Sequence, residues 1–232
     1  MSERDAWEEQ LECKGRVLVF EEATSTQDAA IAGGLQGGDV CVAIEQTAGR
    51  GRRGNPWDAT GGVALTVVLD ECSLMLPIAV GASLAASLNN ALPRVQVGIK
   101  WPNDIIIDGR KLAGILIEER EGRCLVGIGL NVLEPPSADQ KTICLIECGF
   151  KLGRVEAAQL VINSVFTAIS LSERKAIETW KQRDTLIGTT QTIASKGMQF
   201  TGLVIDIVPG NHLLLQTKHK IVTLEADQST VC

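Results

Sequence analysis

Short runs of branched apolar residues, separated by polar turns, predict a succession of β-strands in the first part of the chain. Two dipeptides, Asp108–Gly109 and Glu121–Gly122, are typical of tight hairpin turns and predict an antiparallel meander around them. The predicted strands are residues 17–20, 40–45, 62–69, 95–100, 104–107, 111–119 and 124–132.

Helical patterns lie between and after these strands. Residues 27–35 follow a serine–threonine cap, and residues 77–92 are rich in Ala and Leu. Residues 154–183 have the spacing of one long amphipathic helix or a helical pair, and residues 133–141 are expected to form a loop. Strands and helices together predict an α+β fold, in which a mixed β-sheet is flanked by helices.

The pattern changes after Gly188. Short β-runs there alternate with turns at residues 195–197, 209–211 and 218–220. Such a tail is too short for a sandwich and suits a small barrel of about four or five strands. We therefore predict two domains, a larger one over residues 1–187 and a small C-terminal β-barrel over residues 188–232.

Composition restricts the chemistry that the chain can perform. Its 232 residues are 45% apolar and 22% charged, with 28 acidic and 22 basic side chains and a net charge of −6. This acidic balance argues against a general nucleic-acid binder, which would present a basic face. Both histidines, His212 and His219, lie near the C-terminus, so a histidine base or histidine metal cluster is excluded from the rest of the chain.

The N-terminal segment and the cysteines predict where the protein works. Residues 1–12 are acidic without an apolar core, so they are not a signal peptide, and no apolar run approaches the roughly 20 residues of a membrane span. Seven cysteines without a C-x-x-C pair fit reduced thiols better than a disulfide framework, and Cys144 and Cys148 lack the further ligands of a zinc site. We expect a cytoplasmic protein that does not bind membranes.

A glycine–arginine segment, residues 49–54, carries the sharpest chemical signal. It has the form G-x-G-x-x-G, but a dinucleotide-binding turn must open a helix, and here Asn55, Pro56 and Trp57 lead toward another strand. The alternative is a flexible loop whose guanidinium groups bind an anion such as a phosphate or carboxylate. A solvated basic loop remains equally compatible with the residues.

Further polar segments make an anion-binding pocket more plausible than a plain surface loop. Residues 100–104 and 110–114 concentrate positive charge around a strand end and a hairpin, although a simple turn and an edge charge would also explain them. Gly127 and Gly129 leave one face of a strand bare, as a ligand or a bulge would require. No nucleophile is paired with a base, and neither G-x-S-x-G nor a Walker A sequence is present.

These segments, taken in order, resemble the motifs of the biotin–protein ligases. The resemblance spans residues 24–131, and the family also has a small C-terminal barrel. It implies a synthetase-like catalytic domain that converts biotin and ATP, with Mg²⁺, to biotinyl-5′-AMP, and then biotinylates one lysine of the biotin carboxyl carrier protein of acetyl-CoA carboxylase. The matching residues are Ser25-Thr26-Gln27, Gln46 to Gly54, Lys100-Trp101-Pro102-Asn103-Asp104, Arg110 to Leu116, and Gly127-Ile128-Gly129-Leu130-Asn131.

The resemblance also implies roles for individual residues. The catalytic residues would be Lys111, Arg52 and Asp104, with Asp104 as a base in the transfer step and close to any Mg²⁺. Biotin would contact Ser25, Thr26, Gln27, Gln46, Arg50, Gly51, Arg52, Lys111, Gly114 and Leu116. ATP and the adenylate would contact Arg50, Arg52, Arg53, Trp57, Lys100, Asn103, Gly129 and Asn131. Two positions depart from the family pattern. Gln27 stands where the family often has Asn and keeps an amide one methylene longer, so that contact can survive by repacking. Asn55 stands in place of an arginine or a similar group, which puts a phosphate contact there in doubt.

Other interpretations stay open. A lipoate–protein ligase would share the fold and the adenylation chemistry, and a non-catalytic sensor could hold biotin or a nucleotide in the same pocket. Some family members carry an N-terminal helix-turn-helix domain, whereas only a short acidic segment precedes Glu21 here, so we expect no nucleic-acid partner. A homodimer is compatible with the family, but the sequence does not decide it.

Overall fold

A seven-stranded mixed β-sheet forms the centre of the computed structural model, which describes residues 2–135, 141–208 and 210–231. Its order is β1-β2-β5-β9-β8-β7-β6; β1 and β2 are parallel and the other neighbours are antiparallel, which confirms the predicted mixed sheet. The strands are β1 (Val17–Ala23), β2 (Val40–Gln46), β5 (Val63–Leu69), β6 (Val97–Lys100), β7 (Asp104–Ile107), β8 (Arg110–Arg120) and β9 (Arg123–Leu130).

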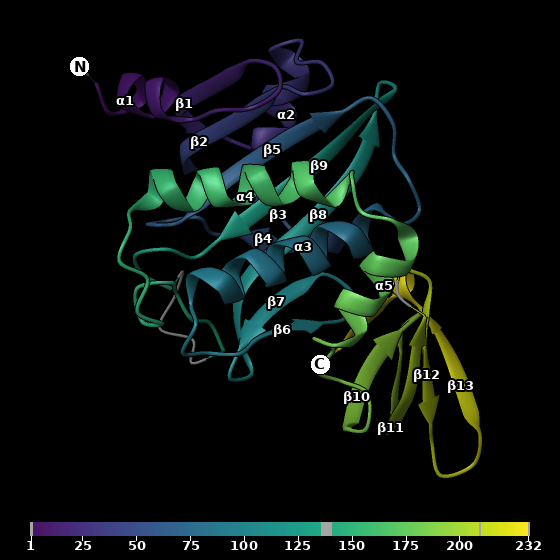
Figure 1. The fold of residues 1–232 in the computed structure, drawn as a ribbon. Helices are drawn as coiled ribbons and strands as arrows, with labels where there is room; N and C mark the ends of the chain where they lie inside the picture. Colours follow the sequence, from purple (N-terminus) through teal and green to yellow (C-terminus); the bar gives the residue numbers. More distant parts are fainter. Residues whose placement is uncertain (1, 136–140, 209, 232) are drawn as a thin grey trace.

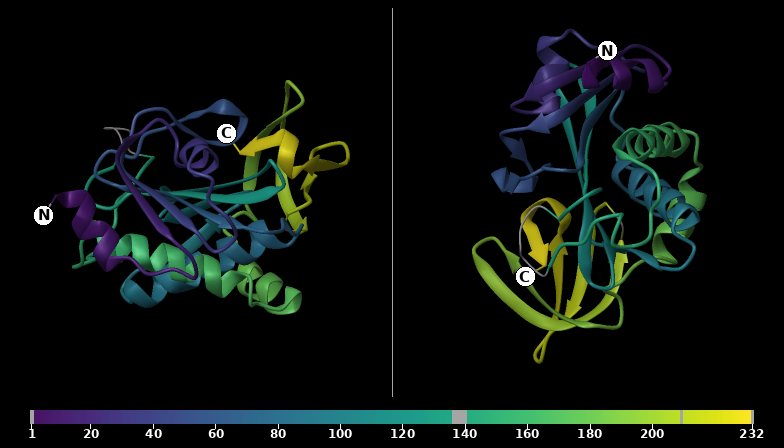
Figure 2. Two further views of the ribbon diagram at one scale, coloured as in Figure 1. Left: turned by 90° about the horizontal axis from the view of Figure 1, so that it is seen from above. Right: turned by 90° about the vertical axis from the view of Figure 1, so that its left-hand side faces the viewer.

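Helices cover both faces of this sheet (Figures 1 and 2). One face carries α3 (Leu76–Ala91) and α4 (Arg154–Ala168), with α5 (Glu173–Lys181) packed on α3. The opposite face carries α2 (Thr26–Ala32). The N-terminal helix α1 (Glu3–Gln10) packs on the edge strand β1. The pattern predicted over residues 154–183 is therefore a helical pair, and the predicted flanking helices are confirmed.

The main core lies between the sheet and α3. All seven residues of β5 are buried, because the strand is central and covered on both faces. Leu84 and Leu88 of α3 are fully buried in the same core, and the small residues of this helix allow it to approach the sheet closely. A second, smaller cluster, which includes Leu35 and Val68, fills the space beneath α2. The pocket described below is therefore built on a rigid support.

The C-terminal part is a five-stranded antiparallel sheet in the order β13-β12-β11-β10-β14. This confirms the predicted strand-rich unit. Within residues 190–208 and 210–231 no pairing joins β13 to β14, so hydrogen bonds do not close the sheet into the barrel that we expected. The elements are β10 (Thr190–Ser195), β11 (Met198–Val208), β12 (His212–Gln216), β13 (Ile221–Glu225), the 3-10 turn η2 (Ala226–Gln228) and β14 (Ser229–Val231).

The segment after α5 ties the two sheets together. The amide of Ile99, on edge strand β6, donates to the Arg183 carbonyl at 2.8 Å, and the Thr185 amide donates back to the Ile99 carbonyl at 3.2 Å. The division into domains at residue 187 remains a prediction. The predicted loop 133–141 lies partly outside the described residues. No helix in the described part of the chain is long and apolar enough to span a membrane.

The cysteines correct one expectation. Cys72 and Cys124 form a disulfide, with their Cα atoms 5.1 Å apart, whereas we expected only reduced thiols. The pairing of β5 with β9 places Cys124 opposite Leu69, and the chain continues from Leu69 to Cys72. Because 52 residues separate the two cysteines, their spacing in the sequence does not reveal this contact. Among the described residues, Cys13, Cys41, Cys144 and Cys148 are free thiols.

Candidate active site

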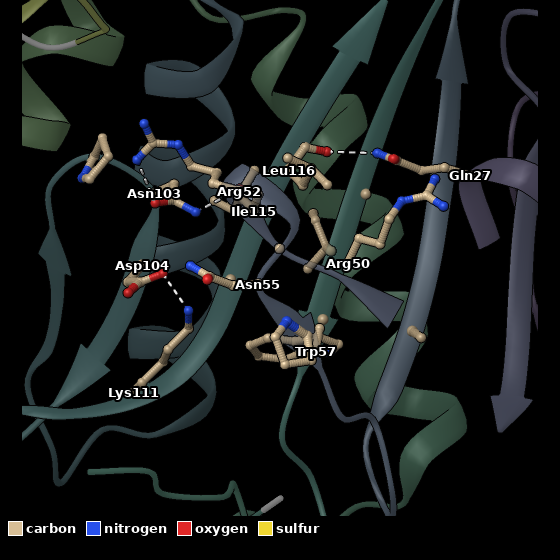
Figure 3. Close-up of a pocket in the computed structure, with 18 of the residues that line it drawn as sticks. Gln27, Arg50, Arg52, Asn55, Trp57, Asn103, Asp104, Lys111, Ile115 and Leu116 are labelled. Atoms are coloured by element: carbon tan, nitrogen blue, oxygen red, sulfur yellow. Dashed lines mark hydrogen bonds and ion pairs between the residues drawn. The ribbon is translucent and has the colours of Figure 1, made fainter. Parts of the chain in front are cut away.

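A pocket with a volume of about 160 Å³ opens on the sheet face opposite α3 and α4 (Figure 3). Its walls come from α2, from β8 and β9, from the segment 49–57 and from β14. Almost every residue that the sequence analysis assigned to ligand binding lines it. These residues are Ser25, Thr26, Gln27, Gln46, Arg50, Gly51, Arg52, Trp57, Lys100, Asn103, Asp104, Lys111, Gly114, Leu116 and Gly129.

Glycines on β8 and β9 form the floor of the pocket. Gly114 lies opposite Gly129, and the β8–β9 register runs without interruption, so the bare positions are not a bulge. A Cβ at Gly129 would overlap the indole ring of Trp57, and one at Gly127 would lie 2.7 Å from Nε2 of Gln27. We expected a ligand to lie close to these glycines. In the structure the side chains of Trp57 and Gln27 lie over this part of β9 instead.

The start of α2 supplies buried polar groups at one end. The Thr26 amide donates to Oε1 of Gln46 at 3.0 Å, and Thr66 donates to the Thr26 hydroxyl at 2.8 Å. Nε2 of Gln27 donates to the Leu116 carbonyl at 3.0 Å (Figure 3). Ser25 is the N-cap residue, yet its side chain makes no capping hydrogen bond. Thr26, Gln27 and Gln46 are therefore held in place by contacts with other segments, whereas the Ser25 side chain does not cap the helix.

The turn at residues 101–104 forms the opposite end. Nδ2 of Asn103 donates to the Ile115 carbonyl at 2.9 Å, and the Ile115 amide donates to the Asn103 carbonyl at 3.0 Å. Trp101 is only 1% exposed, so it anchors the turn in the core. Asn103 and Asp104 consequently face the pocket from a fixed position.

Two of the basic side chains in the pocket already have acidic partners. Nζ of Lys111 lies 2.7 Å from Oδ1 of Asp104 and 5.1 Å from the centre of the Trp57 ring. Arg50 forms a two-point ion pair with Asp28, at 2.7 and 2.8 Å. The hydrogen bonds from Arg50 are the largest cause that holds the pKa of Asp28 down, at about 2.

Arg52 and Lys100 are the two basic side chains of the pocket that form no ion pair within the described part of the chain. Arg52 donates to Oδ1 of Asn103 at 3.4 Å and to the Ala226 carbonyl, and its burial, followed by the nearby charge of Arg53, lowers its pKa. Within residues 2–135, 141–208 and 210–231, neither Arg52 nor Lys100 makes an ion pair with a carboxylate. A partly buried cation without a counter-ion favours the binding of an anion.

Two predicted residues lie outside the pocket lining. Asn131 is buried, and its amide donates to the carbonyls of Lys111 and Ile143 at 3.2 and 3.0 Å, so it supports the strand that carries Lys111. Arg53 is exposed, has a positive φ of 59° and donates to Oγ1 of Thr230 at 3.1 Å.

The structure also adds residues that the sequence analysis did not select. Thr230 and Val231 of β14 line the pocket, although they lie far along the chain from its other walls. Asn55, which we noted only as a departure from the family pattern, lines it as well. No local signal could have identified the two β14 residues, because only the docking of the C-terminal sheet brings them there.

A dedicated metal centre is not built into the described chain. Residues 2–135, 141–208 and 210–231 contain no group of three His, Cys, Asp or Glu side chains placed to bind one ion. Asp104 is the one carboxylate that lines the pocket within these ranges. Mg²⁺ commonly binds one or two carboxylates together with substrate phosphates. A single carboxylate, Asp104, therefore fits a Mg²⁺ ion that is held jointly by the protein and the substrate phosphates.

Comparison with known proteins agrees with the geometry. Residues 20–133 match the biotin/lipoate A/B protein ligase family. The bifunctional ligase/repressor BirA of Salmonella typhimurium is 30% identical over 224 residues, which cover 87% of this chain and 70% of that protein. The chain belongs to this ligase family. A biotin–[acetyl-CoA-carboxylase] ligase of Mycobacterium tuberculosis is 35% identical to it over 146 residues, 56% of this chain and 55% of the other.

Solved structures show the same fold as this ligase. The biotin protein ligase of Aquifex aeolicus, in complex with biotin and ATP, superposes with a TM-score of 0.81 at 23% identity, over 93% of this chain and 98% of the other. A biotin protein ligase of Leishmania major, in complex with biotinyl-5-AMP, gives a TM-score of 0.62 at 23% identity, over 90% and 98% of the two chains. The predicted fold class is confirmed.

Proposed function

We propose that this enzyme activates biotin with ATP to biotinyl-5′-AMP and transfers the biotinyl group to one lysine of a biotin carboxyl carrier protein. The observation that carries the proposal is the pocket itself. It brings together Arg52 and Lys100, which have no carboxylate partner among the described residues, the Lys111–Asp104 pair and the buried polar start of α2. The relatives named above as biotin ligases support biotin as the acid.

The two ends of the pocket suggest how the substrates bind. Ser25, Thr26 and Gln46 would contact the polar head group of biotin, because their side chains meet at the start of α2. Lys111 would contact the biotin carboxylate, and Trp57 would lie beside the nucleotide. In this arrangement Lys111 exchanges one carboxylate partner, Asp104, for a second that comes from the substrate.

The first step requires charge stabilisation rather than a base. A carboxylate oxygen of biotin attacks the α-phosphorus of ATP, a new P–O bond forms, and the bond to the pyrophosphate leaving group breaks. Biotin is already an anion at neutral pH, so no proton moves. Arg52 and Lys100 would stabilise the negative charge on the phosphates, and a preorganised cation in a partly buried site is effective in this role. Asp104 would hold a Mg²⁺ ion together with the phosphates, and this ion would supply further positive charge there.

The second step forms an amide bond. The lysine amine of the carrier attacks the acyl carbon of the adenylate, the C–O bond to AMP breaks, and the amine loses a proton. We assign Asp104 as the proton acceptor because it is the carboxylate that lines the described pocket. We propose that this reaction, which consumes ATP, takes place in the cytoplasm.

Pyrophosphate release tests the choice of acid. The protein is incubated with ATP and Mg²⁺ and with either biotin or lipoate, and the initial rates are compared. We expect release with biotin at a rate at least about tenfold above that with lipoate, corresponding to about 1.4 kcal/mol. Faster release with lipoate would assign the second candidate, lipoate–protein ligase, which the name of the matching family also covers. Tight binding of biotin without release would indicate a sensor.

A further inference from the structure

An ion-pair cluster beside the pocket joins the segment 49–57 to helix α2. Asp28 lies in the first turn of α2, directly after the pocket residues 25–27. Its Oδ2 accepts a hydrogen bond from Nη1 of Arg50 at 2.7 Å, and its Oδ1 accepts one from Nη2 at 2.8 Å. Arg120, at the end of β8, donates to the same Oδ1 at 2.6 Å. Arg50 lines the pocket, whereas Asp28 and Arg120 do not.

The segment 49–57 has few other attachments to the body of the protein. Among the described residues, its two short strands, β3 (Gly49–Arg50) and β4 (Pro56–Trp57), pair only with each other, and the turn between them has no buried residue. Apart from the packing of Trp57 on the sheet, the segment is held by polar contacts of its arginines. A segment with few buried apolar contacts opens at low free energy, so the loss of one polar contact changes how often it opens.

The contact between Asp28 and Arg50 is the most specific of these attachments. A carboxylate and a guanidinium that meet through two parallel hydrogen bonds fix both distance and orientation. The side chains are 35% and 40% exposed, so the pair is a surface contact that can break without unfolding the core. By contrast, Arg52 donates to neutral carbonyl oxygens, and Arg53 donates to a hydroxyl group.

We propose that Asp28 is a positioning residue, which holds Arg50 and thereby keeps the segment 49–57 over the pocket. This inference deepens the proposed function: a closed segment would retain the reactive acyl-adenylate until the carrier lysine arrives. Asp28 itself touches no substrate in this scheme. Its effect passes through Arg50, so it should govern substrate affinity and the retention of the intermediate more than the rate of the chemical step.

Hydrogen exchange in the ligand-free protein tests the positioning role without reference to any reaction. Asp28→Asn keeps the size of the side chain and removes its charge. We expect the amides of residues 49–57 to exchange about tenfold faster in this variant, while the amides of β5 and α3 are unchanged. Glu178→Gln is the matched control, because it removes an exposed partner of Arg174 on α5, away from the pocket, and should leave the segment unchanged.

A double-mutant cycle identifies Arg50 as the partner. Arg50→Gln should open the segment to a similar extent, and the double variant Asp28→Asn/Arg50→Gln should open it no further than either single change. Unchanged exchange in Asp28→Asn overturns the proposal. Effects that add in the double variant also overturn it, because they would mean that the two residues act independently.

Kinetics then separate positioning from a general structural effect. In Asp28→Asn we expect KM for biotin and the release rate of the adenylate to rise about fivefold or more, with kcat for pyrophosphate release changed less than about twofold. A lower kcat with unchanged KM would contradict the assignment. If the wild-type protein released no pyrophosphate with either acid, the proposed function would fail, while the exchange experiment would still decide the role of Asp28.

Discussion

Nζ of Lys111 lies 2.7 Å from Oδ1 of Asp104, and this pair spans the two strands of the β7–β8 hairpin. Asp104 lies opposite Gly114, and Lys111 lies opposite Ile106, so the hairpin register sets the distance between the two charges. The centre of the Trp57 ring lies 5.1 Å from the same Nζ. The positive charge of Lys111 is therefore fixed in place before any substrate binds.

Replacement of Lys111 by Ala should therefore affect chemistry more than binding. We expect the rate of adenylate formation to fall on the order of 100-fold, because one preorganised charge contributes this much in comparable sites, while the affinity for biotin changes less than about fivefold. Pyrophosphate release and equilibrium titration measure the two quantities. Lys175→Ala, on the exposed face of α5, is the control. Rates within a few-fold of the wild type would show that Lys111 is only an edge charge.

The arginines of the segment 49–57 should differ in importance. Arg52 lines the pocket and Arg53 does not, although the family resemblance assigned both to the nucleotide. We expect Arg52→Gly to shorten the lifetime of the bound adenylate about tenfold or more. Arg53→Gly should have a much smaller effect, since a glycine readily adopts the positive φ found at this position. Chase experiments with labelled biotin measure both lifetimes, and equal effects would contradict the geometry.

Gly129 should not tolerate a side chain. An added methyl group would overlap the Trp57 indole, so Gly129→Ala should displace Trp57, lower the free energy of unfolding by about 1–3 kcal/mol and reduce adenylation. Gly81→Ala, inside α3, is the matched control: the nearest atoms would lie 3.9 Å from the new Cβ, and a helical alanine is favoured by up to about 1 kcal/mol. Urea titration distinguishes the two, and equal stability of both variants would contradict the packing.

Acid should break the contact between Asp28 and Arg50 only at low pH. The hydrogen bonds from Arg50 lower the pKa of Asp28 from 3.8 to about 2 in the folded protein. Because the folded value is the lower one, the pair stabilises the fold above about pH 4, and this contribution is lost as the pH falls toward 2. Solvent screens the half-exposed pair, so we expect about 1 kcal/mol or less.

The free energy of unfolding measured at pH 5 and pH 2.5 tests this expectation. Asp28→Asn should reduce the difference between the two values by that amount, and Glu178→Gln should leave it nearly unchanged. An identical pH dependence in the wild type and in Asp28→Asn would show that the pair does not stabilise the folded protein.

Local patterns predicted most of the sheet and of the pocket floor. The turn at Asp108–Gly109 and the strand β5 could be predicted because hairpin turns and buried strands have characteristic local sequence patterns. The glycine–arginine segment and the turn at Asn103 were evident because their residue types are unusual in that order. Most of the proposed ligand-binding residues come from these stretches, which explains why the resemblance found them.

Contacts between distant segments could not be predicted in the same way. Thr230 enters the pocket only because the C-terminal sheet docks against the segment 49–57. Asp28 directly follows the Ser25-Thr26-Gln27 motif, but its partners Arg50 and Arg120 are distant along the chain. The Cys72–Cys124 bond likewise depends on the pairing of β5 with β9. Each of these features depends on tertiary packing rather than on local residue preference.

Transfer of the biotinyl group to a carrier protein tests the proposed function most directly. The enzyme is incubated with biotin, ATP, Mg²⁺ and the biotin carrier domain of an acetyl-CoA carboxylase, and the intact carrier is analysed by mass spectrometry. We predict the addition of one biotinyl group to one lysine, dependent on ATP and greatly reduced in Lys111→Ala. An unmodified carrier, in the presence of a control ligase that does modify it, would contradict the proposed function.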